Sequence, residues 1–351
     1  MSHPHMQIPD DVVIDEIRQL LDDAADPSIA GWCRRFRHSS AWMKLDRWLP
    51  LLEQARGGGQ FDMPPQPDDI APIEDILDRR KTEFARRKTA WDAAFLTAVE
   101  IKIDGPFAIC HLGDPHLDDP GTDIAGLEHD LKVIRDTPGM IAANVGDVTN
   151  NWGGRLARLH GEQTTTVAES WRLAEWFFDQ CKWLYFVMGN HDMWSGDGSP
   201  LLWIAKARNC TMSKSQVRLN LICPNGVEIR VNARHDFTGH SQWNVVHAPA
   251  KAAQLGFKDH ILTCGHRHVS GYGVTVDPAT GLVSHCLMVE GYKVCDEYAH
   301  AKGFPRHHIA PYAVTVIDPA AQHQNSLIQV YHDLELAADF LTWLRKKQKA
   351  A

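Results

Sequence analysis

The chain has 351 residues, a net charge of −8 and 44% hydrophobic residues, enough for a sizeable core. Its length allows two domains, or one large domain with an extension. No apolar run approaches the roughly 20 residues that cross a bilayer, which excludes a membrane-spanning protein. The first residues lack the basic and apolar segments of a secretory signal, so we expect a cytoplasmic protein. The eight cysteines form no Cys-x-x-Cys pair, which argues against a disulfide or zinc framework.

The first hundred residues are predicted to form a helical N-terminal extension, residues 1–100. Apolar residues at helical spacing predict helices over Asp10–Ala24, from about Ser28 to Leu49, and from about Ile70 to Val99. We expect Ser28 to cap the second helix and Pro50 to help end it. Glycine and proline are frequent in Arg56–Pro67, which therefore reads as a linker.

From Pro106 onward, short apolar runs alternate with helical stretches, a pattern that predicts βαβ units. The runs expected to be strands are Pro106–Cys110, Met140–Val145, Trp183–Met188 and His260–Cys264. The expected helices are Leu127–Asp136, Thr164–Cys181, Leu201–Arg208 and Ser241–Leu255. A hairpin is predicted between Gln216–Cys223 and Val227–Arg234, turning at Pro224-Asn225-Gly226.

Five blocks of polar residues follow strand-like runs. They are Asp114-Pro115-His116, Gly146-Asp147, Gly189-Asn190-His191-Asp192, the single residue His235, and Gly265-His266-Arg267-His268. Ligands at the ends of successive strands converge on one site. Aspartate, histidine and asparagine together supply enough ligands for two metal ions.

The residue types in these blocks suit a pair of divalent ions acting on phosphorus, since two ions can clamp the attacking and leaving oxygens of an in-line displacement. Asp147 is the candidate for a bridging carboxylate, because Gly146 lets the chain turn sharply before it. Asp114 and His116 are two residues apart, so in an extended segment they project to the same side and can hold one ion. His266 and His268 repeat that spacing, and Asn190 offers a neutral oxygen ligand.

In this order, the five blocks resemble the motifs of the calcineurin-like metallophosphoesterase superfamily over roughly residues 106–276. The resemblance implies two mixed β-sheets packed as a sandwich with helices outside, in a domain spanning residues 101–351. It assigns one metal to Asp114, His116, Asp147 and His268, and the other to Asp147, Asn190, His235 and His266. It further implies that His191 protonates the leaving alkoxide and that Asp192 holds the His191 imidazole. One departure is Asn150, where the family often has aspartate, and it bears on local hydrogen bonding and substrate preference.

The fourth block is a single histidine, and two other histidines lie nearby. We favour His235 because it ends the strand-like run Val227–Arg234, whereas His240 is the alternative ligand and is otherwise expected to contact the substrate phosphate. Asn150 and Asn151 are the other expected substrate contacts.

The ligand types leave the metal open among Mn²⁺, Fe, Zn²⁺ and Ni²⁺, of which Mn²⁺ is our prediction, whereas Mg²⁺ prefers an oxygen-only shell. Two such ions would lower the pKa of a shared water so that hydroxide attacks the phosphate ester near neutral pH. A free imidazole titrates near the same pH, so a histidine such as His191 is a suitable residue type for a general acid.

Three functions follow as hypotheses. Basic clusters in the predicted N-terminal helices favour a phosphodiesterase or nuclease acting on nucleic acid. However, the first hundred residues hold 18 acidic and 13 basic side chains, and this net acidity favours a solvated surface instead. The alternatives are a phosphomonoesterase acting on a small molecule or phosphoprotein, and a non-catalytic scaffold with this fold. A scaffold predicts missing ligands, and every block is complete. The sequence leaves the oligomeric state open.

Overall fold

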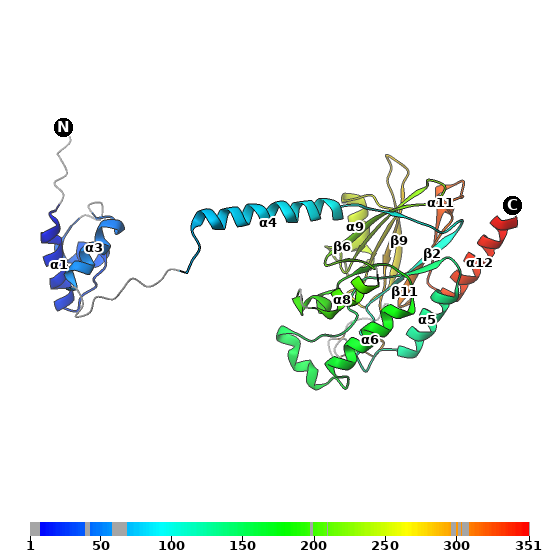
Figure 1. Ribbon diagram of the computed structural model, residues 1–351, viewed down its shortest axis with the longest axis horizontal. Helices are drawn as coiled ribbons and strands as arrows, with labels where there is room; N and C mark the ends of the chain where they lie inside the picture. The colour runs from blue at the N-terminus through cyan, green and yellow to red at the C-terminus, as the bar shows by residue number, and fades with distance from the viewer. Residues whose placement is uncertain are drawn as a thin grey trace. The chain divides into compact units, whose positions relative to one another are not determined.

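The computed structural model describes residues 8–38, 43–57, 69–196, 199–208, 210–295, 300, 303 and 309–350. The chain divides into two compact units, Met1–Arg80 and Lys81–Ala351. The helices of the first unit are α1 (Asp10–Asp22), α2 (Ile29–Phe36) and α3 (Leu45–Ala55), and helix α4 (Ile73–Ala94) contains the division (Figure 1). None of the helices in the described ranges is both long enough and apolar enough to cross a membrane.

The first unit is a small helical body with its own core. Val13, Ile17 and Leu20 recur at helical spacing on α1 and are buried with Trp32 of α2 and Trp48 of α3. Stacking this stripe against two tryptophans removes much apolar surface from water, which is the main favourable term for so small a unit.

The expected helix from Ser28 to Leu49 is two helices in the structure. Ser28 does cap the first of them, accepting a hydrogen bond from the Gly31 amide at 3.1 Å, but α2 ends at Arg37, which has a left-handed φ of 57°. Pro50 lies inside α3 and does not end a helix, because α3 begins only at Leu45 and Pro50 falls in its second turn. Most of the predicted linker Arg56–Pro67 lies outside the described residues.

The second unit contains two mixed six-stranded sheets. Sheet A has the order β1-β6-β7-β8-β10-β9 and sheet B the order β12-β11-β2-β3-β4-β5. The strands of sheet A are β1 (Thr97–Glu100), β6 (Gln216–Ile222), β7 (Glu228–Arg234), β8 (Ile261–Cys264), β9 (Gly271–Val276) and β10 (Val283–Met288). Those of sheet B are β2 (Phe107–Leu112), β3 (Met140–Asn144), β4 (Trp183–Val187), β5 (Thr211–Ser213), β11 (Tyr312–Ile317) and β12 (Ile328–Tyr331).

The two sheets pack face to face, as alternate residues along the strands show. Phe107 and Ile109 of β2 are buried in one cluster with Leu219 and Val231 of sheet A, whereas Cys110 of the same strand points to the opposite face. Because side chains alternate across a strand, a strand that is buried along its whole length must be covered on both faces. The two mixed sheets predicted from the sequence are therefore confirmed.

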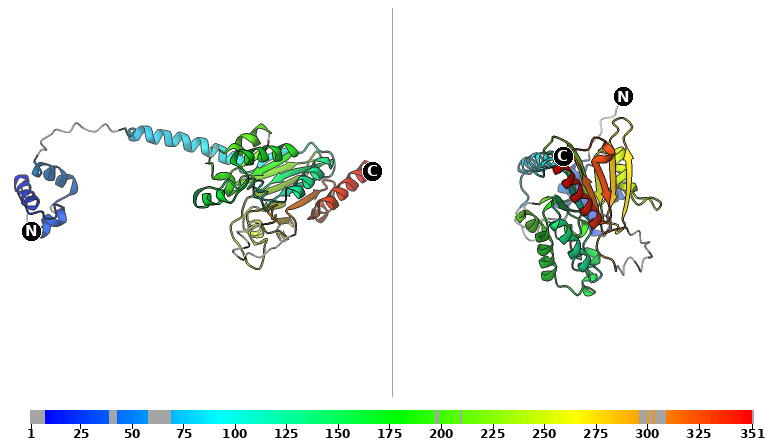
Figure 2. Two further views of the ribbon diagram at one scale, coloured as in Figure 1. Left: turned by 90° about the horizontal axis from the view of Figure 1, so that it is seen from below. Right: turned by 90° about the vertical axis from the view of Figure 1, so that its right-hand side faces the viewer.

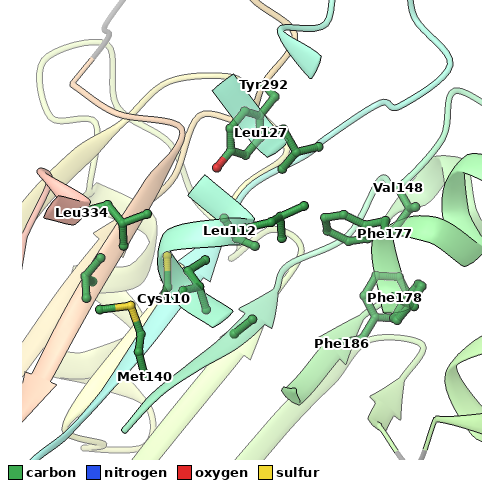
Figure 3. Packing of buried hydrophobic residues seen from close by; sticks show 14 of the residues in the cluster. Cys110, Leu112, Leu127, Met140, Val148, Phe177, Phe178, Phe186, Tyr292 and Leu334 are labelled. Atoms are coloured by element: carbon green, nitrogen blue, oxygen red, sulfur yellow. The ribbon is translucent and has the colours of Figure 1, made fainter. Parts of the chain in front are cut away.

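Helices cover the outer faces of both sheets (Figures 1 and 2). The helical elements of this unit are α5 (Ile124–Asp136), the 3₁₀ helix η2 (Gly154–Gly161), α6 (Val167–Gln180), α7 (Asn190–Met193), α8 (Pro200–Ala207), α9 (His247–Leu255), α11 (Gln324–Leu327) and α12 (Leu334–Ala350). Leu127 of α5 and Phe177 of α6 pack on Cys110 and Leu112 of β2 in the cluster drawn in Figure 3. Residues of α9 pack on the outer face of sheet A, beside Leu262 and Cys286. The unit is thus a four-layer sandwich.

The β6–β7 hairpin is confirmed, with antiparallel pairing and Gly226 at a φ of 83° in its turn. The third predicted helix ends early, however. Helix α4 stops at Ala94, and Thr97–Glu100 form strand β1 at the edge of sheet A, parallel to β6. Residues 97–100, which the sequence analysis placed in the extension, thus pair within the second unit. The expected helix from Ser241 begins only at His247.

Candidate metal centre

Each of the five blocks follows a strand of the sandwich. Asp114 comes after β2, Asp147 after β3 and Asn190 after β4, and these three strands are parallel neighbours in sheet B. His235 directly follows β7 and His266 follows β8, which are parallel neighbours in sheet A. Because the carboxyl ends of parallel strands meet at one edge of a sheet, the blocks come together where these edges of the two sheets lie.

One group of ligand atoms comes from Asp114, His116 and His268. The Nε2 atoms of His116 and His268 are 3.2 Å apart, and the His268 Nε2 is 3.5 Å from the Asp114 Oδ2. The His116 Nε2 is also 3.9 Å from the Asp147 Oδ2. These three residues form one of the groups able to hold a metal ion.

A second group surrounds His235. Its Nε2 lies 3.2 Å from the Asp147 Oδ2, 3.0 Å from the Asn190 Oδ1 and 3.0 Å from the His266 Nδ1. The Asp147 Oδ2 therefore borders both groups. The seven residues predicted as ligands come together in the structure, in or beside these two groups.

The arrangement fits divalent cations. Two ligands about 2.0 to 2.3 Å from one ion are about 2.8 to 3.8 Å from each other at tetrahedral or octahedral angles. The close contacts above fall in or near that range, and two of them join ring nitrogens, which need a proton or a cation between them. Asp114 and His116 are almost fully buried, and neither the Asp114 Oδ1 nor the His116 Nδ1 has a hydrogen-bond partner among the described residues. Buried polar atoms without partners are costly.

The ionisable groups of the cluster shift one another's pKa values. Burial alone would lower the pKa of His235, but the Asp147 carboxylate outweighs it and raises this pKa to about 10. Burial likewise acts against the Asp147 carboxylate, yet the neighbouring His235 cation holds its pKa below the usual range. Burial lowers the pKa of His116 and of His266, with further lowering from a neighbouring histidine. Neutral imidazoles carry the lone pairs that bind metals, and a bound cation would replace the proton of His235.

The backbone at the site is held in an uncommon conformation. His116, Asp147, His266 and His268 have left-handed φ values of 41°, 50°, 71° and 49°. Residues other than glycine rarely adopt this conformation, and residues that do so are concentrated at functional sites. Gly146 has a φ of 119°, and a Cβ there would lie 2.5 Å from the Gly189 nitrogen and 2.7 Å from the His235 Nδ1. The glycine expected before Asp147 is therefore required for both conformation and space.

His191 borders the same cluster. Its Nδ1 hydrogen bonds to the backbone carbonyl of Asn150, and its Nε2 is 4.0 Å from the Asp147 Oδ2. The ring lies 4.9 Å from that of His116 and beside two tryptophans, with ring centroids 4.1 Å away for Trp194 and 5.2 Å away for Trp152. This fixes the imidazole with Nε2 toward the cluster.

The expected role of Asp192 is wrong. Its carboxylate does not hold the His191 ring, because the chain starts helix α7 at Asn190 and Asp192 points back to the start of that helix. It accepts hydrogen bonds from the amides of Gly189, Asp147 and Val148 at 2.7 to 3.0 Å. Burial, reinforced by the Asp147 charge, raises the pKa of Asp192 to about 7. Asp192 thus fixes the backbone that carries Asp147.

The three residues expected to contact substrate differ in position. Asn150 is buried, and its Nδ2 donates to the Asp119 Oδ2 at 2.9 Å. Asn151 donates from its Nδ2 to the His191 carbonyl at 2.7 Å, so it braces the His191 backbone. His240 is exposed, and none of the hydrogen bonds or ion pairs found in the described ranges joins it to the cluster. Of the two histidines considered for the fourth block, His235 is the one that reaches the cluster.

A further segment at the site, residues 289–294 after β10, was not among the predicted blocks. The Tyr292 amide donates to the Asp114 carbonyl at 3.2 Å, and a Cβ on Gly291 would lie 2.4 Å from that same oxygen. Lys293 follows, with its side chain 9% exposed. The apolar run Val283–Val289 ending at Glu290-Gly291 has the same form as the other blocks, and that signal was available in the sequence.

No family model matches the sequence, and neither does any of the curated proteins that were compared with it. Solved structures that are similar in fold include Vacuolar Protein Sorting 29 from Cryptosporidium parvum, at 12% identity and a TM-score of 0.37, covering 65% of this chain and 97% of that one. They also include the calcineurin-like phosphoesterase YfkN from Bacillus subtilis, at 12% identity and a TM-score of 0.33, covering 69% of this chain and 99% of that one.

Proposed function

We propose that the protein is a dinuclear metal-dependent phosphoesterase that hydrolyses a P–O bond. The observation that carries the proposal is the shared position of Asp147. One oxygen of its carboxylate lies between a His116 group and a His235 group, each with enough donors for one ion. A carboxylate common to two sites is what a pair of ions acting on one phosphate requires.

Asp114, His116, Asp147 and His268 would hold one ion, and Asp147, Asn190, His235 and His266 the other. When bound, the ions supply a hydroxide nucleophile near neutral pH and neutralise charge on the phosphoryl oxygens. Mixed imidazole, carboxylate and amide donors suit Mn²⁺, which we propose as the activating ion, and also suit Fe, Zn²⁺ and Ni²⁺.

His191 is the proposed general acid. With its Nδ1 donating to the Asn150 carbonyl, the Nε2 faces the cluster and can carry a second proton. Transfer of that proton to the leaving oxygen would release an alcohol instead of an alkoxide, which matters most for poor leaving groups. The ring needs no carboxylate partner for its orientation, because the Asn150 carbonyl and the two tryptophans fix it.

The proposal is tested by loading the protein with Mn²⁺ and assaying mono-, di- and cyclic phosphate esters, DNA and RNA. We expect His191→Asn to keep two ions per chain and to lose about 100-fold or more in turnover on esters with poor leaving groups, with a smaller loss on p-nitrophenyl esters. His235→Ala should lose one ion, whereas His240→Ala should keep both. A wild-type protein that holds two ions but hydrolyses no member of the panel would contradict the proposed function.

A further inference from the structure

Trp194 is an exposed tryptophan beside the proposed general acid. It is 37% exposed, and the centroid of its ring lies 4.1 Å from that of His191. Met193, which precedes it, is 44% exposed, and Ser195, which follows it, is exposed as well. The surface next to His191 is therefore open to solvent and carries a large aromatic ring.

Neighbouring residues hold Trp194 in place. The backbone of Gly153 lies against it, since a Cβ added to Gly153 would be 3.1 Å from the Trp194 Cβ and 3.4 Å from its Cγ. The Trp152 ring supports it further, at a centroid distance of 6.3 Å and an angle of 32°. A tryptophan packed in this way on one side keeps its remaining surface for another molecule.

Asn151 connects the loop after β3 to the segment that carries Trp194. Its Nδ2 donates to the His191 carbonyl at 2.7 Å, and its Oδ1 accepts a hydrogen bond from the Ser195 hydroxyl at 3.1 Å. The residues on either side of Met193 and Trp194 are thus bound to one side chain. The position of the indole relative to the imidazole is consequently fixed before any ligand binds.

The leaving group of the proposed reaction would pass close to this ring. A general acid lies within about 3.2 Å of the oxygen that it protonates, which puts that oxygen at most about 8.5 Å from the centre of the Trp194 ring. On its other side, His191 faces the ligand groups, with its Nε2 4.0 Å from the Asp147 Oδ2 and its ring 4.9 Å from that of His116. The alcohol part of the ester therefore has to extend away from these groups, where Trp194 borders the solvent.

We propose that Trp194 is a specificity-determining residue on which a flat aromatic ring of the leaving alcohol stacks. This inference rests on the proposed function and adds the chemical class of the leaving group to it. Stacking on an indole buries apolar surface and gains the attraction between two aromatic rings. Because the indole is already fixed, little side-chain entropy is lost on binding. An aliphatic alcohol offers no flat face and gains less.

The test compares benzyl phosphate with ethyl phosphate, each also as its methyl diester, using Mn²⁺-loaded wild-type protein and Trp194→Leu. Both alcohols are poor leaving groups that need a proton, so the main difference between them is the ring. In Trp194→Leu, kcat/KM for the benzyl ester should fall about tenfold relative to the ethyl ester. Trp194→Phe should keep most of the preference. Trp203→Leu, which removes a tryptophan 69% exposed on α8, should leave the ratio unchanged.

A purely structural role of Trp194 predicts a different result. If the indole only positions His191, the benzyl and ethyl esters should lose kcat/KM by the same factor, and that outcome would overturn the inference. Adenosine 5′-monophosphate, which carries its ring on a ribose, separates two sources of the ring. A loss on this nucleotide as large as that on benzyl phosphate would support recognition of a nucleobase, and a loss on benzyl phosphate alone would support a ring next to the ester.

Binding of phosphonates separates this inference from the proposed function. Benzylphosphonate and ethylphosphonate have no ester oxygen to cleave, and calorimetry measures their affinity directly. Wild-type protein should bind benzylphosphonate about tenfold more tightly, and Trp194→Leu should bind the two alike. A wild-type protein that hydrolyses none of the esters would count against the proposed function, while this difference in affinity would still support the role of Trp194. Wild-type protein that binds the two phosphonates equally, or binds neither, would overturn the inference.

Discussion

Asp192 shows how a residue within a motif can serve the site without touching its chemistry. It is fully buried and occupies the third position of helix α7, where its carboxylate accepts the Gly189 amide that begins the helix. The same carboxylate accepts the amides of Asp147 and Val148 from the neighbouring loop. One side chain therefore holds the loops after β3 and β4 at a fixed separation.

We expect Asp192→Asn to lower the free energy of unfolding by about 3 kcal/mol. The Asn side chain has one oxygen and one NH₂ group in place of two oxygens, so backbone amides that now donate to Asp192 would face a group that cannot accept a hydrogen bond. Metal affinity should fall about 10- to 100-fold as the Asp147 backbone loses its support. Urea unfolding and metal titration measure the two effects. Asp136→Asn, at an exposed pair with Lys132, is the matched control and should change stability by less than about 0.5 kcal/mol. Retention of full metal affinity in Asp192→Asn would contradict this role.

At single residues, the positions of the motif residues were easier to predict from the sequence than those of the residues that support them. Asp114 and His266 occur in short motifs at strand ends, and the structure brings them close together, with the His266 amide donating to the Asp114 Oδ2. The role of Asp192 depended on a helix of four residues, α7, which periodicity cannot reveal. Tyr292 lies 24 residues beyond the last block, and the hydrogen bond from its amide to the Asp114 carbonyl depends on the pairing of β10 with β8.

Among the elements, the loop after β3 is tied to three other parts of the chain through Asp118. The buried Asp118 carboxylate accepts the Asn150 amide at 2.7 Å, the Gln163 side chain at 2.9 Å and the Ser170 hydroxyl of α6 at 2.9 Å. Asn150 in turn accepts from His191. The position of helix α6 is thereby connected to the orientation of the proposed general acid.

Asp118→Ala should lower the free energy of unfolding by about 3 kcal/mol, because three donors lose their acceptor. It should also reduce kcat more than metal content, since none of the proposed ligands bonds to Asp118. Ser170→Ala removes one of the three bonds and should cost about 1 kcal/mol. Equal stability and turnover in the two variants would show that the hydrogen bond between His191 and the Asn150 carbonyl does not depend on Asp118.

Elements with a strong local sequence pattern were predicted correctly, whereas elements that form through contacts between distant residues were not. The β6–β7 hairpin has alternating side chains and a glycine turn, so its prediction needed no knowledge of the rest of the chain. Strand β1 follows a long helical pattern without a glycine or proline, and it is a strand because β6 offers a parallel edge more than 100 residues away. The division between α2 and α3 likewise follows from the left-handed Arg37, a residue with no sequence preference for that conformation.

At the scale of the whole molecule, buried neutral histidines tie stability to pH. His285 of β10 accepts or donates a hydrogen bond with the Tyr272 hydroxyl at 2.9 Å, and burial lowers the pKa of His285 to about 4. In the unfolded chain the pKa is about 6.5. A lowered folded-state pKa means that the contribution of neutral His285 is complete above about pH 6.5 and is lost as the pH falls toward 4.

Replacing His285 with Gln removes the group that takes up a proton on unfolding, and keeps a side chain that can form hydrogen bonds. Relative to wild type, the variant should therefore gain stability by about 1.2 kcal/mol per pH unit as the pH falls from 6 to 4.5. Urea unfolding of metal-free protein at several pH values measures the difference. Val276→Thr, at an exposed position on β9 with no titratable group, is the control and should run parallel to wild type. If the free energy of unfolding of His285→Gln instead ran parallel to that of wild type over this pH range, the His285 ring would be taking up a proton in the folded state as readily as in the unfolded one.

The packing of Gly146 against Gly189 determines where the Asp147 carboxylate can lie. A Cβ on Gly189 would lie 2.0 Å from the Asp147 Oδ1, and one on Gly146 would meet the Gly189 nitrogen. The main chain of Gly146 therefore lies against that of Gly189, and the Asp147 carboxylate fills the space beside Gly189. A side chain at either glycine would displace this carboxylate or its loop, so the place of the one oxygen that borders both ligand groups depends on two residues that have no side chain.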